Sequence, residues 1–167
     1  FYKVWGSGPD DVYIVGQKGA ILHWDGVALV EKSLDLNADL IGIWGTGSDR
    51  VAVVGGRGNG VVGLWDGSDW RAVDLAPMPG LNGVWLRGDT LHAVGVFATA
   101  VKIDFNTGEV LGEEEYLREL FPETPNIDLH ALHGSEAGRL TAIGGNYMQP
   151  SGPYNGVVVS RMLAADE

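Results

Sequence analysis

The chain repeats itself four times. A segment whose fifth residue is aromatic recurs at residues 1–6, 40–45, 81–86 and 129–134. After a turn-rich spacer, each copy continues with an apolar segment that closes in glycine, at residues 12–16, 51–55, 91–95 and 140–144. The aromatic position holds Trp5, Trp44, Trp85 and His133, and it lies 11, 11, 10 and 11 residues before the closing glycine. This constant spacing indicates a repeat architecture.

The copies contain further short apolar segments. A third follows in every copy, at residues 21–26, 62–67, 101–104 and 157–160, and a fourth follows in the first three, at residues 28–32, 70–75 and 109–112. Glycine supplies 26 of 167 residues, as expected for many tight turns between short strands. Four strands per roughly 40 residues are typical of a β-propeller blade. The sequence therefore predicts an all-β propeller with four repeats of about four antiparallel strands, the last incomplete, at approximately 1–39, 40–80, 81–128 and 129–167.

Two insertions interrupt the repeats. In the third copy the extra length lies at residues 113–126, where the i,i+4 pair Glu114 and Arg118 predicts one or two helical turns that Pro122 ends. The fourth copy has an insertion at residues 146–155 that is rich in Pro, Gly and Tyr.

Charge and composition exclude several classes of partner. Eleven Lys and Arg residues face 22 Asp and Glu residues, and the net charge of −11 would repel a nucleic acid backbone or an anionic membrane. No apolar run approaches the roughly 18 residues of a membrane helix. The absence of cysteine excludes disulfides and thiolate zinc sites. We therefore expect neither nucleic acid binding nor membrane insertion.

The amino-acid pattern of the repeats resembles that of a known family. Residues 4–26, VWGSGPDDVYIVGQKGAILHWDG, are similar to the repeats of large bacterial surface and exported β-propeller proteins, which are related to photosystem II assembly-factor-like and Asp-box (sialidase-type) propellers. The resemblance extends over nearly the whole chain and is clearest in the first two copies. It implies a propeller and an extracellular, cell-surface or periplasmic location, but no particular reaction, because the fold carries many functions.

The expected strand order sorts the loops onto two faces. The first face collects turns that are rich in acidic residues: Asp10, Asp11, Asp25, Asp49, Asp66, Asp69, Asp89, Asp104 and Glu136. Because Asp readily bonds its own turn backbone, we expect structural turns here rather than a ring of cation ligands. The loops of the second face differ from copy to copy. The candidate ligand-binding residues there are Lys18, Arg57, Asn59, Phe97, Asn146 and Tyr147, and the alternative interpretation is that they belong to ordinary surface loops.

The tryptophans recur at fixed repeat positions. Trp5, Trp44 and Trp85 share one position, and Trp24 and Trp65 share another. Recurrence of this kind favours packing between blades over ligand stacking.

No catalytic motif is present. His130 and His133 are three apart on a predicted strand and would point to opposite faces, so we expect no metal site and no cofactor. Sialidase-type propellers use several arginines around the axis, whereas only Arg57 falls in a ligand-face loop. The sequence predicts a non-catalytic, lectin-like binding module for a protein or carbohydrate. The alternative is an Asp-box-type glycan hydrolase, which would need a pair of carboxylates near the axis.

Three assemblies are compatible with four repeats whose last copy ends after a third strand. The chain can form a closed four-bladed disc, a homodimer that completes an eight-bladed ring, or part of a longer propeller. We favour the last two.

Overall fold

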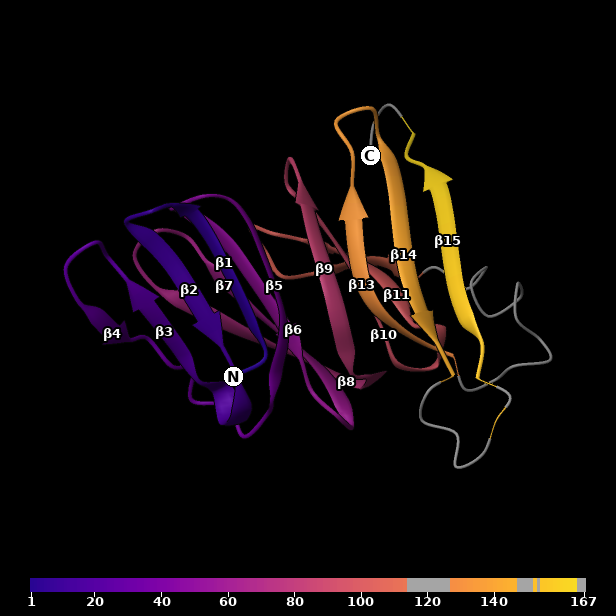
Figure 1. Ribbon diagram of the computed structural model, residues 1–167, viewed down its shortest axis with the longest axis horizontal. Helices are drawn as coiled ribbons and strands as arrows, with labels where there is room; N and C mark the ends of the chain where they lie inside the picture. Colours follow the sequence, from indigo (N-terminus) through magenta and orange to yellow (C-terminus); the bar gives the residue numbers. More distant parts are fainter. Residues whose placement is uncertain (114–126, 147–151, 153, 165–167) are drawn as a thin grey trace. The chain divides into compact units, whose positions relative to one another are not determined.

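The computed structural model describes residues 1–113, 127–146, 152 and 154–164 (Figure 1). Its regular structure there consists of strands and two short 3₁₀ turns. The chain divides into two compact units, Phe1–Leu81 and Asn82–Glu167, each of which holds two sheets. Within the described part, no helix is long and apolar enough to cross a membrane.

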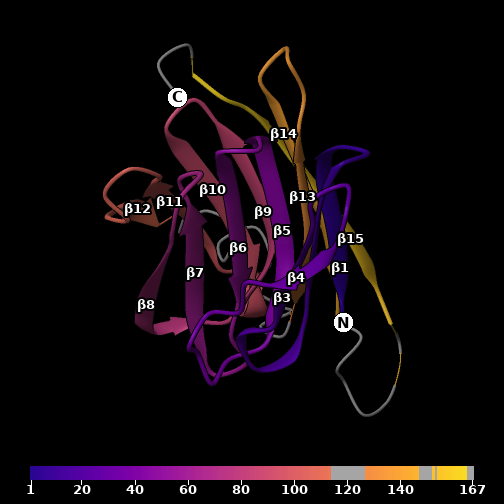
Figure 2. The same cartoon turned by 90° about the vertical axis from the view of Figure 1, so that its left-hand side faces the viewer.

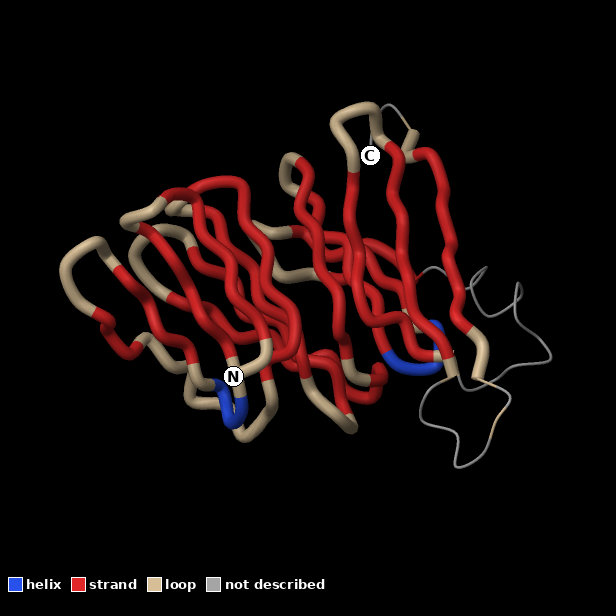
Figure 3. The backbone as a smooth tube through the Cα atoms, in the orientation of Figure 1, coloured by secondary structure: helices blue, strands red, loops and turns tan. Residues whose placement is uncertain are grey.

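The first unit contains two four-stranded antiparallel sheets. The first blade consists of β1 (Lys3–Gly8), β2 (Asp11–Val15), β3 (Ile21–Trp24) and β4 (Leu29–Glu31). The second blade consists of β5 (Leu40–Gly47), β6 (Arg50–Gly55), β7 (Asn59–Trp65) and β8 (Trp70–Pro79), which lie side by side in Figure 2. The turn η1 (Gln17–Gly19) links β2 to β3 (Figure 3).

The second unit contains a four-stranded and a three-stranded sheet. The third blade consists of β9, which begins at the unit boundary (Leu81–Arg87), β10 (Thr90–Gly95), β11 (Ala100–Asp104) and β12 (Val110–Glu113), with η2 (Val96–Ala98) between β10 and β11. The fourth blade consists of β13 (Asp128–Gly134), β14 (Arg139–Gly145) and β15 (Gly156–Met162).

Strand order follows the chain in every sheet, as the repeats predict. Among the described residues the last sheet has three strands, and the incompleteness of the final repeat stays a prediction. The helical turns predicted around Glu114 and Arg118 lie outside the described residues, as does most of the insertion at residues 146–155.

The core of the first unit forms where alternate strand residues point inward. Tyr13, Val15, Ile21, Val51 and Val53 belong to one buried cluster that spans both blades. Tyr13 is 1% exposed, and this burial, together with the nearby negative charge of Asp11, raises the pKa of its hydroxyl to about 12.

The recurring tryptophans of the innermost strands pack one blade on the next. In the first unit the Trp5 ring lies on Gly45 of β5, so close that a Cβ added there would be 2.5 Å from the ring. In the second unit the Trp85 ring lies in the same way on Gly134 of β13, where an added Cβ would be 2.3 Å from the ring. The predicted packing role is thus confirmed for Trp5 and Trp85, and it explains why glycine follows the aromatic position in the receiving blade.

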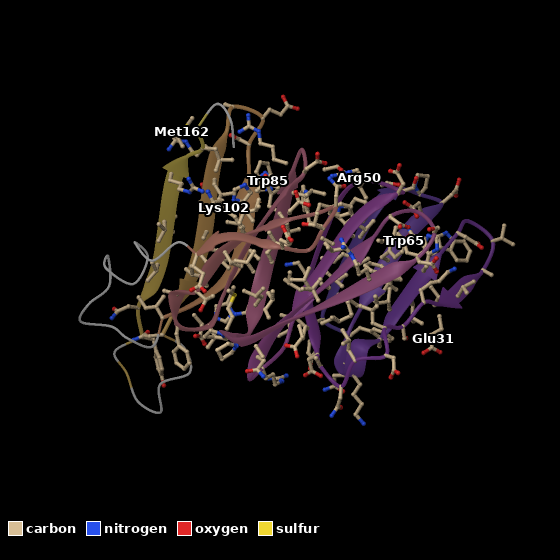
Figure 4. The ribbon with its side chains drawn as sticks, turned by 180° about the vertical axis from the view of Figure 1, so that it is seen from behind. Glu31, Arg50, Trp65, Trp85, Lys102 and Met162 are labelled. Carbon is tan, nitrogen blue, oxygen red and sulfur yellow. The ribbon has the colours of Figure 1, made fainter. Side chains whose placement is uncertain are left out.

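The second tryptophan series closes turns. The indole N–H of Trp24 donates to the Pro9 carbonyl (3.2 Å), and that of Trp65 donates to the Ser48 carbonyl (2.9 Å). Pro9 and Ser48 both lie in the turn between the first two strands of their blades. Trp65 also packs against Trp70, with ring centroids 5.6 Å apart. Figure 4 labels Trp65 and Trp85 among the side chains of their units.

Candidate functional site

The acidic turns of the first face bond their own backbone. Asp25 accepts the N–H groups of Val27 and Ala28 at 2.9 and 2.8 Å. Asp66 repeats this with Ser68 and Asp69 in the second blade. The Thr107 N–H donates to Asp104 in the third. The prediction that these aspartates serve turns is therefore confirmed for three blades.

These hydrogen bonds stabilise the ionised carboxylates. The backbone N–H of Asp69 and the hydroxyl and N–H of Ser68 lower the pKa of Asp66 to about 2. The N–H groups of Ala28 and Val27 lower the pKa of Asp25 in the same way. In the described part of the chain, no group of three or more His, Asp or Glu side chains is placed to hold a metal ion.

One cluster on this face has the residue types of a hydrolase. His23 Nε2 lies 2.7 Å from Asp11 Oδ1, its ring stacks on Tyr13 with centroids 4.2 Å apart, and Ser7 Oγ donates to Asp11 Oδ2. Nucleophilic catalysis requires the histidine between serine and carboxylate. Here the carboxylate lies between them, so the serine proton is held by Asp11 and not by the imidazole of His23. Sequence analysis did not pair Asp11 with His23, because the contact forms between two neighbouring strands.

The opposite loops of the first unit converge on Asp39, in the connection between the two blades. Its Oδ1 accepts the Lys18 backbone N–H (3.3 Å). Its Oδ2 accepts Arg57 Nε (2.9 Å) and the Tyr2 hydroxyl (3.3 Å). The Tyr2 oxygen in turn accepts Arg57 Nη2 and Gln17 Nε2, each at 3.1 Å. We call Tyr2, Gln17, Lys18, Asp39 and Arg57 the Asp39 cluster.

The cluster holds an exposed cation in place. The Arg57 side chain is 69% exposed, whereas the Asp39 side chain that orients it is 17% exposed. The hydrogen bond from Arg57 is the main reason that the pKa of Asp39 lies below its usual range, and the Lys18 N–H and the Tyr2 hydroxyl add to it. Arg57 Nη1 has no hydrogen-bond partner among the described residues, so one edge of the guanidinium is free to bind a ligand.

An open cavity of about 420 Å³ lies beside Arg57. Its walls combine apolar side chains with polar ones from three loops and strand ends: Leu36, Asn37, Ala38, Asp39, Gly56, Arg57, Gly58, Asn59, Val61 and Asp74. A cavity that combines apolar side chains with converging polar groups is typical of a recognition site.

The predicted site residues of the first unit thus come together. Lys18 and Arg57 meet through Asp39, and Arg57 and Asn59 line the same cavity. The sequence analysis did not select Tyr2 or Asp39. Asp39 had a repeat signature, since it precedes the inner-strand residue Leu40 just as Asp128 precedes Leu129.

Phe97, in the second unit, occupies a turn of the same construction. Lys18 and Phe97 both adopt left-handed conformations, with φ of 54° and 55°. The Phe97 N–H donates to Asp128 Oδ1 at 3.0 Å, as the Lys18 N–H donates to Asp39. The Phe97 side chain is 50% exposed. The aspartate before the next inner strand therefore stabilises the turn in both units, and the turn side chain is left in solvent.

Asn146 has a structural place. It is 3% exposed, its side-chain oxygen accepts the Asn155 N–H at 2.6 Å, and its own N–H donates to the Asn155 carbonyl at 3.2 Å. It therefore closes the base of the loop between β14 and β15, and its amide is not presented to a ligand. Tyr147 lies outside the described residues.

Comparison with solved structures identifies the architecture. The chain is similar to the tricorn protease over 96% of its own length and 15% of that chain, with a TM-score of 0.61 and 12% identity. It is similar to YCF48 from Cyanidioschyzon merolae over 93% of its own length and 55% of that chain, with a TM-score of 0.58 and 17% identity. It is similar to the N-terminal domain of Nup159 over 97% of its own length and 44% of that chain, with a TM-score of 0.58 and 12% identity. The chain has the β-propeller fold.

This propeller spans only about half or less of those three chains, so their activities do not transfer to it. No family model matches the chain, and no curated protein sequence matches it significantly. The finer resemblance to bacterial surface repeats stays a prediction.

Proposed function

We propose that this propeller is a non-catalytic interaction module that binds a protein partner through the Asp39 cluster and the neighbouring cavity. The observation that carries the proposal is Arg57, an exposed guanidinium that two hydrogen bonds hold in one orientation. An arginine with a fixed side chain loses little conformational entropy on binding, and arginine is enriched among the residues that dominate protein interfaces.

The residues that line the cavity indicate which groups of a partner protein would bind there. The free edge of Arg57 suits a carboxylate, and Leu36, Ala38 and Val61 suit an apolar group beside it. An acidic side chain next to an apolar one on a partner protein supplies both. Nup159, whose N-terminal domain shares the fold, is bound to Dbp5 in a solved complex, which illustrates a propeller in this kind of role.

Two features favour binding over glycan hydrolysis. A hydrolase needs a carboxylic acid that stays protonated near neutral pH, whereas the pKa of Asp39 is lowered. Asp74, the other acid at the cavity, already accepts the Ala76 N–H at 3.0 Å. A location outside the cytoplasm belongs to the same proposal, as a prediction from the repeat wording.

Site-specific photocrosslinking tests the proposal. A photoreactive amino acid at Asn59 should form an adduct with a partner protein in an extract of the source cells, and Arg57→Glu should abolish it by reversing the charge beside the cavity. The same probe at Ser68, in an acidic turn, is the matched control and should form no such adduct. With the partner purified, Arg57→Ala should weaken binding at least about tenfold.

A panel of chromogenic glycosides separates the alternatives. Turnover by the wild-type chain that disappears in Arg57→Ala would contradict the proposal in favour of a hydrolase. An adduct at Asn59 that persists in Arg57→Glu would place the partner elsewhere on the surface.

A further inference from the structure

The cavity beside Arg57 is lined by three parts of the first unit. Leu36 and Ala38 come from the connection between the two blades, Arg57 comes from the loop before β7, and Asp74 comes from β8. Strands β7 and β8 lie side by side in Figure 2. Among the described residues that line the cavity, Asp74 is the charged one that has no role in the interaction proposed above.

Asp74 presents one carboxylate oxygen. Its Oδ1 accepts the Ala76 N–H at 3.0 Å, whereas its Oδ2 has no hydrogen-bond partner among the described residues. The residue is exposed. A guanidinium binds a carboxylate best through two parallel hydrogen bonds, which would need both oxygens. An ammonium group is a compact point charge and needs only one, so Asp74 favours lysine over arginine.

Arg57 presents the opposite charge. Its Nε and one N–H of Nη2 donate to Asp39 and to the Tyr2 hydroxyl. Nη1 and the second N–H of Nη2 form the other edge of the guanidinium, and this edge has the fork geometry that binds a carboxylate through two hydrogen bonds. The cavity therefore offers one group for a carboxylate and another for an ammonium.

The strand register separates these two groups. Asn59 and Val61 are two residues apart on β7, which corresponds to about 7 Å along an extended strand. Val61 pairs with Asp74, so their Cα atoms are about 5 Å apart across the sheet. Arg57 precedes Asn59 by two residues, and its guanidinium is bonded to Asp39. The guanidinium and the Asp74 carboxylate thus reach the cavity from different ends.

The apolar part of the lining belongs to the core of the first unit. Val61 is 7% exposed and is a member of the buried cluster, and Leu36 and Ala38 pack against that cluster. This surface is therefore formed before a ligand arrives, and it can bury methylene groups.

The balance of charge disfavours a ligand that is only acidic. The lining contains the carboxylates of Asp39 and Asp74 and the single guanidinium of Arg57. An acidic group alone would pair with Arg57 but would be repelled by Asp74. A ligand that carries a carboxylate and a cation, with an apolar stretch between them, matches all three kinds of group.

We infer that the cavity binds the carboxyl-terminal lysine of a partner protein, an inference that rests on the proposed function. The α-carboxylate binds the free edge of Arg57, the four-carbon stem lies on Val61 and Leu36, and the ε-ammonium binds Asp74 Oδ2. Such a residue supplies the carboxylate and the apolar contact of the proposed interaction, and it adds the cation that Asp74 requires.

The probe is Nα-acetyllysine, whose acetyl group replaces the preceding residue of a partner. Titration into the isotope-labelled chain, followed by NMR, should shift the backbone signals of Arg57, Asn59 and Asp74 in a saturable way. Nα-acetyllysine amide lacks the carboxylate and Nα-acetylnorleucine lacks the ammonium, so each should bind at least about fivefold more weakly. Free lysine should also bind more weakly, because its α-ammonium would lie beside the Arg57 guanidinium.

The variants separate a binding role from a structural one. Asp74→Asn keeps the oxygen that accepts the Ala76 N–H but removes the charge. It should weaken binding of Nα-acetyllysine at least about fivefold and leave that of Nα-acetylnorleucine within about twofold of wild type. Arg57→Ala should weaken binding of both compounds, since both carry the carboxylate. Asp69→Asn, which removes an exposed carboxylate from an acidic turn, is the matched control and should bind both as wild type does.

Four results would overturn the inference: no saturable shift with Nα-acetyllysine, equal binding of Nα-acetyllysine and its amide, equal weakening of Nα-acetyllysine and Nα-acetylnorleucine by Asp74→Asn, or tighter binding of free lysine than of Nα-acetyllysine.

The crosslinking experiment at Asn59 keeps the two proposals apart. Saturating Nα-acetyllysine should suppress the adduct with the partner protein. An adduct that forms together with any of the four results above would leave the proposed function standing and remove only the terminal lysine. Binding of Nα-acetyllysine without any adduct at Asn59 would contradict the proposed function, and the inferred protein terminus with it, in favour of a small ligand that contains lysine.

Discussion

Individual aspartate side chains stabilise several turns of this chain. Asp25 and Asp66 hold turns between strands, whereas Asp39 and Asp128 hold the left-handed turn residues Lys18 and Phe97. In each case a carboxylate accepts backbone N–H groups that a short turn leaves without a partner. Part of the acidic composition is therefore used by the fold itself.

This use of carboxylates makes stability depend on acid pH. Asp66, with a pKa of about 2, and Asp25 and Asp39, with lowered pKa values, take up protons at a lower pH in the folded chain than in the unfolded chain. Between about pH 4 and pH 2 the unfolded state therefore binds more protons, and the stabilisation present above that range is lost as the pH falls. We expect the urea midpoint to decrease over this range, and Asp66→Asn to flatten the decrease. Equal slopes for both proteins would contradict the role given to Asp66.

Contacts between elements rest on the pairing of a tryptophan with a glycine. The Trp5 ring covers Gly45, and the only way to add a side chain there is to move the ring or the β5 backbone, because the Arg50 carbonyl lies 2.8 Å from the same point. At this contact a large side chain of one blade therefore packs where the next blade has no side chain.

Gly45→Ala tests this interface. Overpacking of a closed contact typically costs about 1–3 kcal/mol, so we expect the free energy of unfolding to fall by that amount. Gly8→Ala is the control in the same unit, because a Cβ there meets nothing within 4 Å, and we expect a change within about 0.5 kcal/mol. Urea unfolding followed by circular dichroism measures both. Equal losses would show that the methyl group acts through the strand backbone and not through Trp5.

At the scale of elements the sequence was a good guide. The strands were predicted from apolar segments that end in glycine, and each repeat shows this pattern independently of the others. The Asp39 cluster was only half predicted. Its Arg57 and Lys18 stand out as loop residues, but Tyr2 reaches Arg57 across 55 positions and Asp39 across 37, and no local pattern encodes such a contact. Asn146 looked like a loop residue because its burial depends on the return of the chain at Asn155.

The whole molecule consists of two units that differ in their described strands and in their tryptophan content. The first unit has two four-stranded sheets, and the described part of the second has one four-stranded and one three-stranded sheet. Five of the six tryptophans belong to the first unit, and Trp85 is the single tryptophan of the second.

This distribution allows the two units to be followed separately. In Trp85→Phe, tryptophan fluorescence reports on the first unit alone, whereas circular dichroism reports on both. Because Trp85→Phe also removes the ring that packs on Gly134, we expect the second unit of this variant to unfold at a lower urea concentration than the first, so the dichroism midpoint should lie below the fluorescence midpoint. Coincident curves would mean that the molecule unfolds as one cooperative body.

The turn shared by Lys18 and Phe97 has a practical consequence for protein engineering. Its backbone is specified by the aspartate that follows in the chain, so lysine in one unit and phenylalanine in the other occupy the same unusual conformation. The identity of the side chain is thereby separated from the shape of the loop. Randomising positions 18 and 97 while Asp39 and Asp128 stay unchanged should yield a library in which chemistry varies on a constant scaffold.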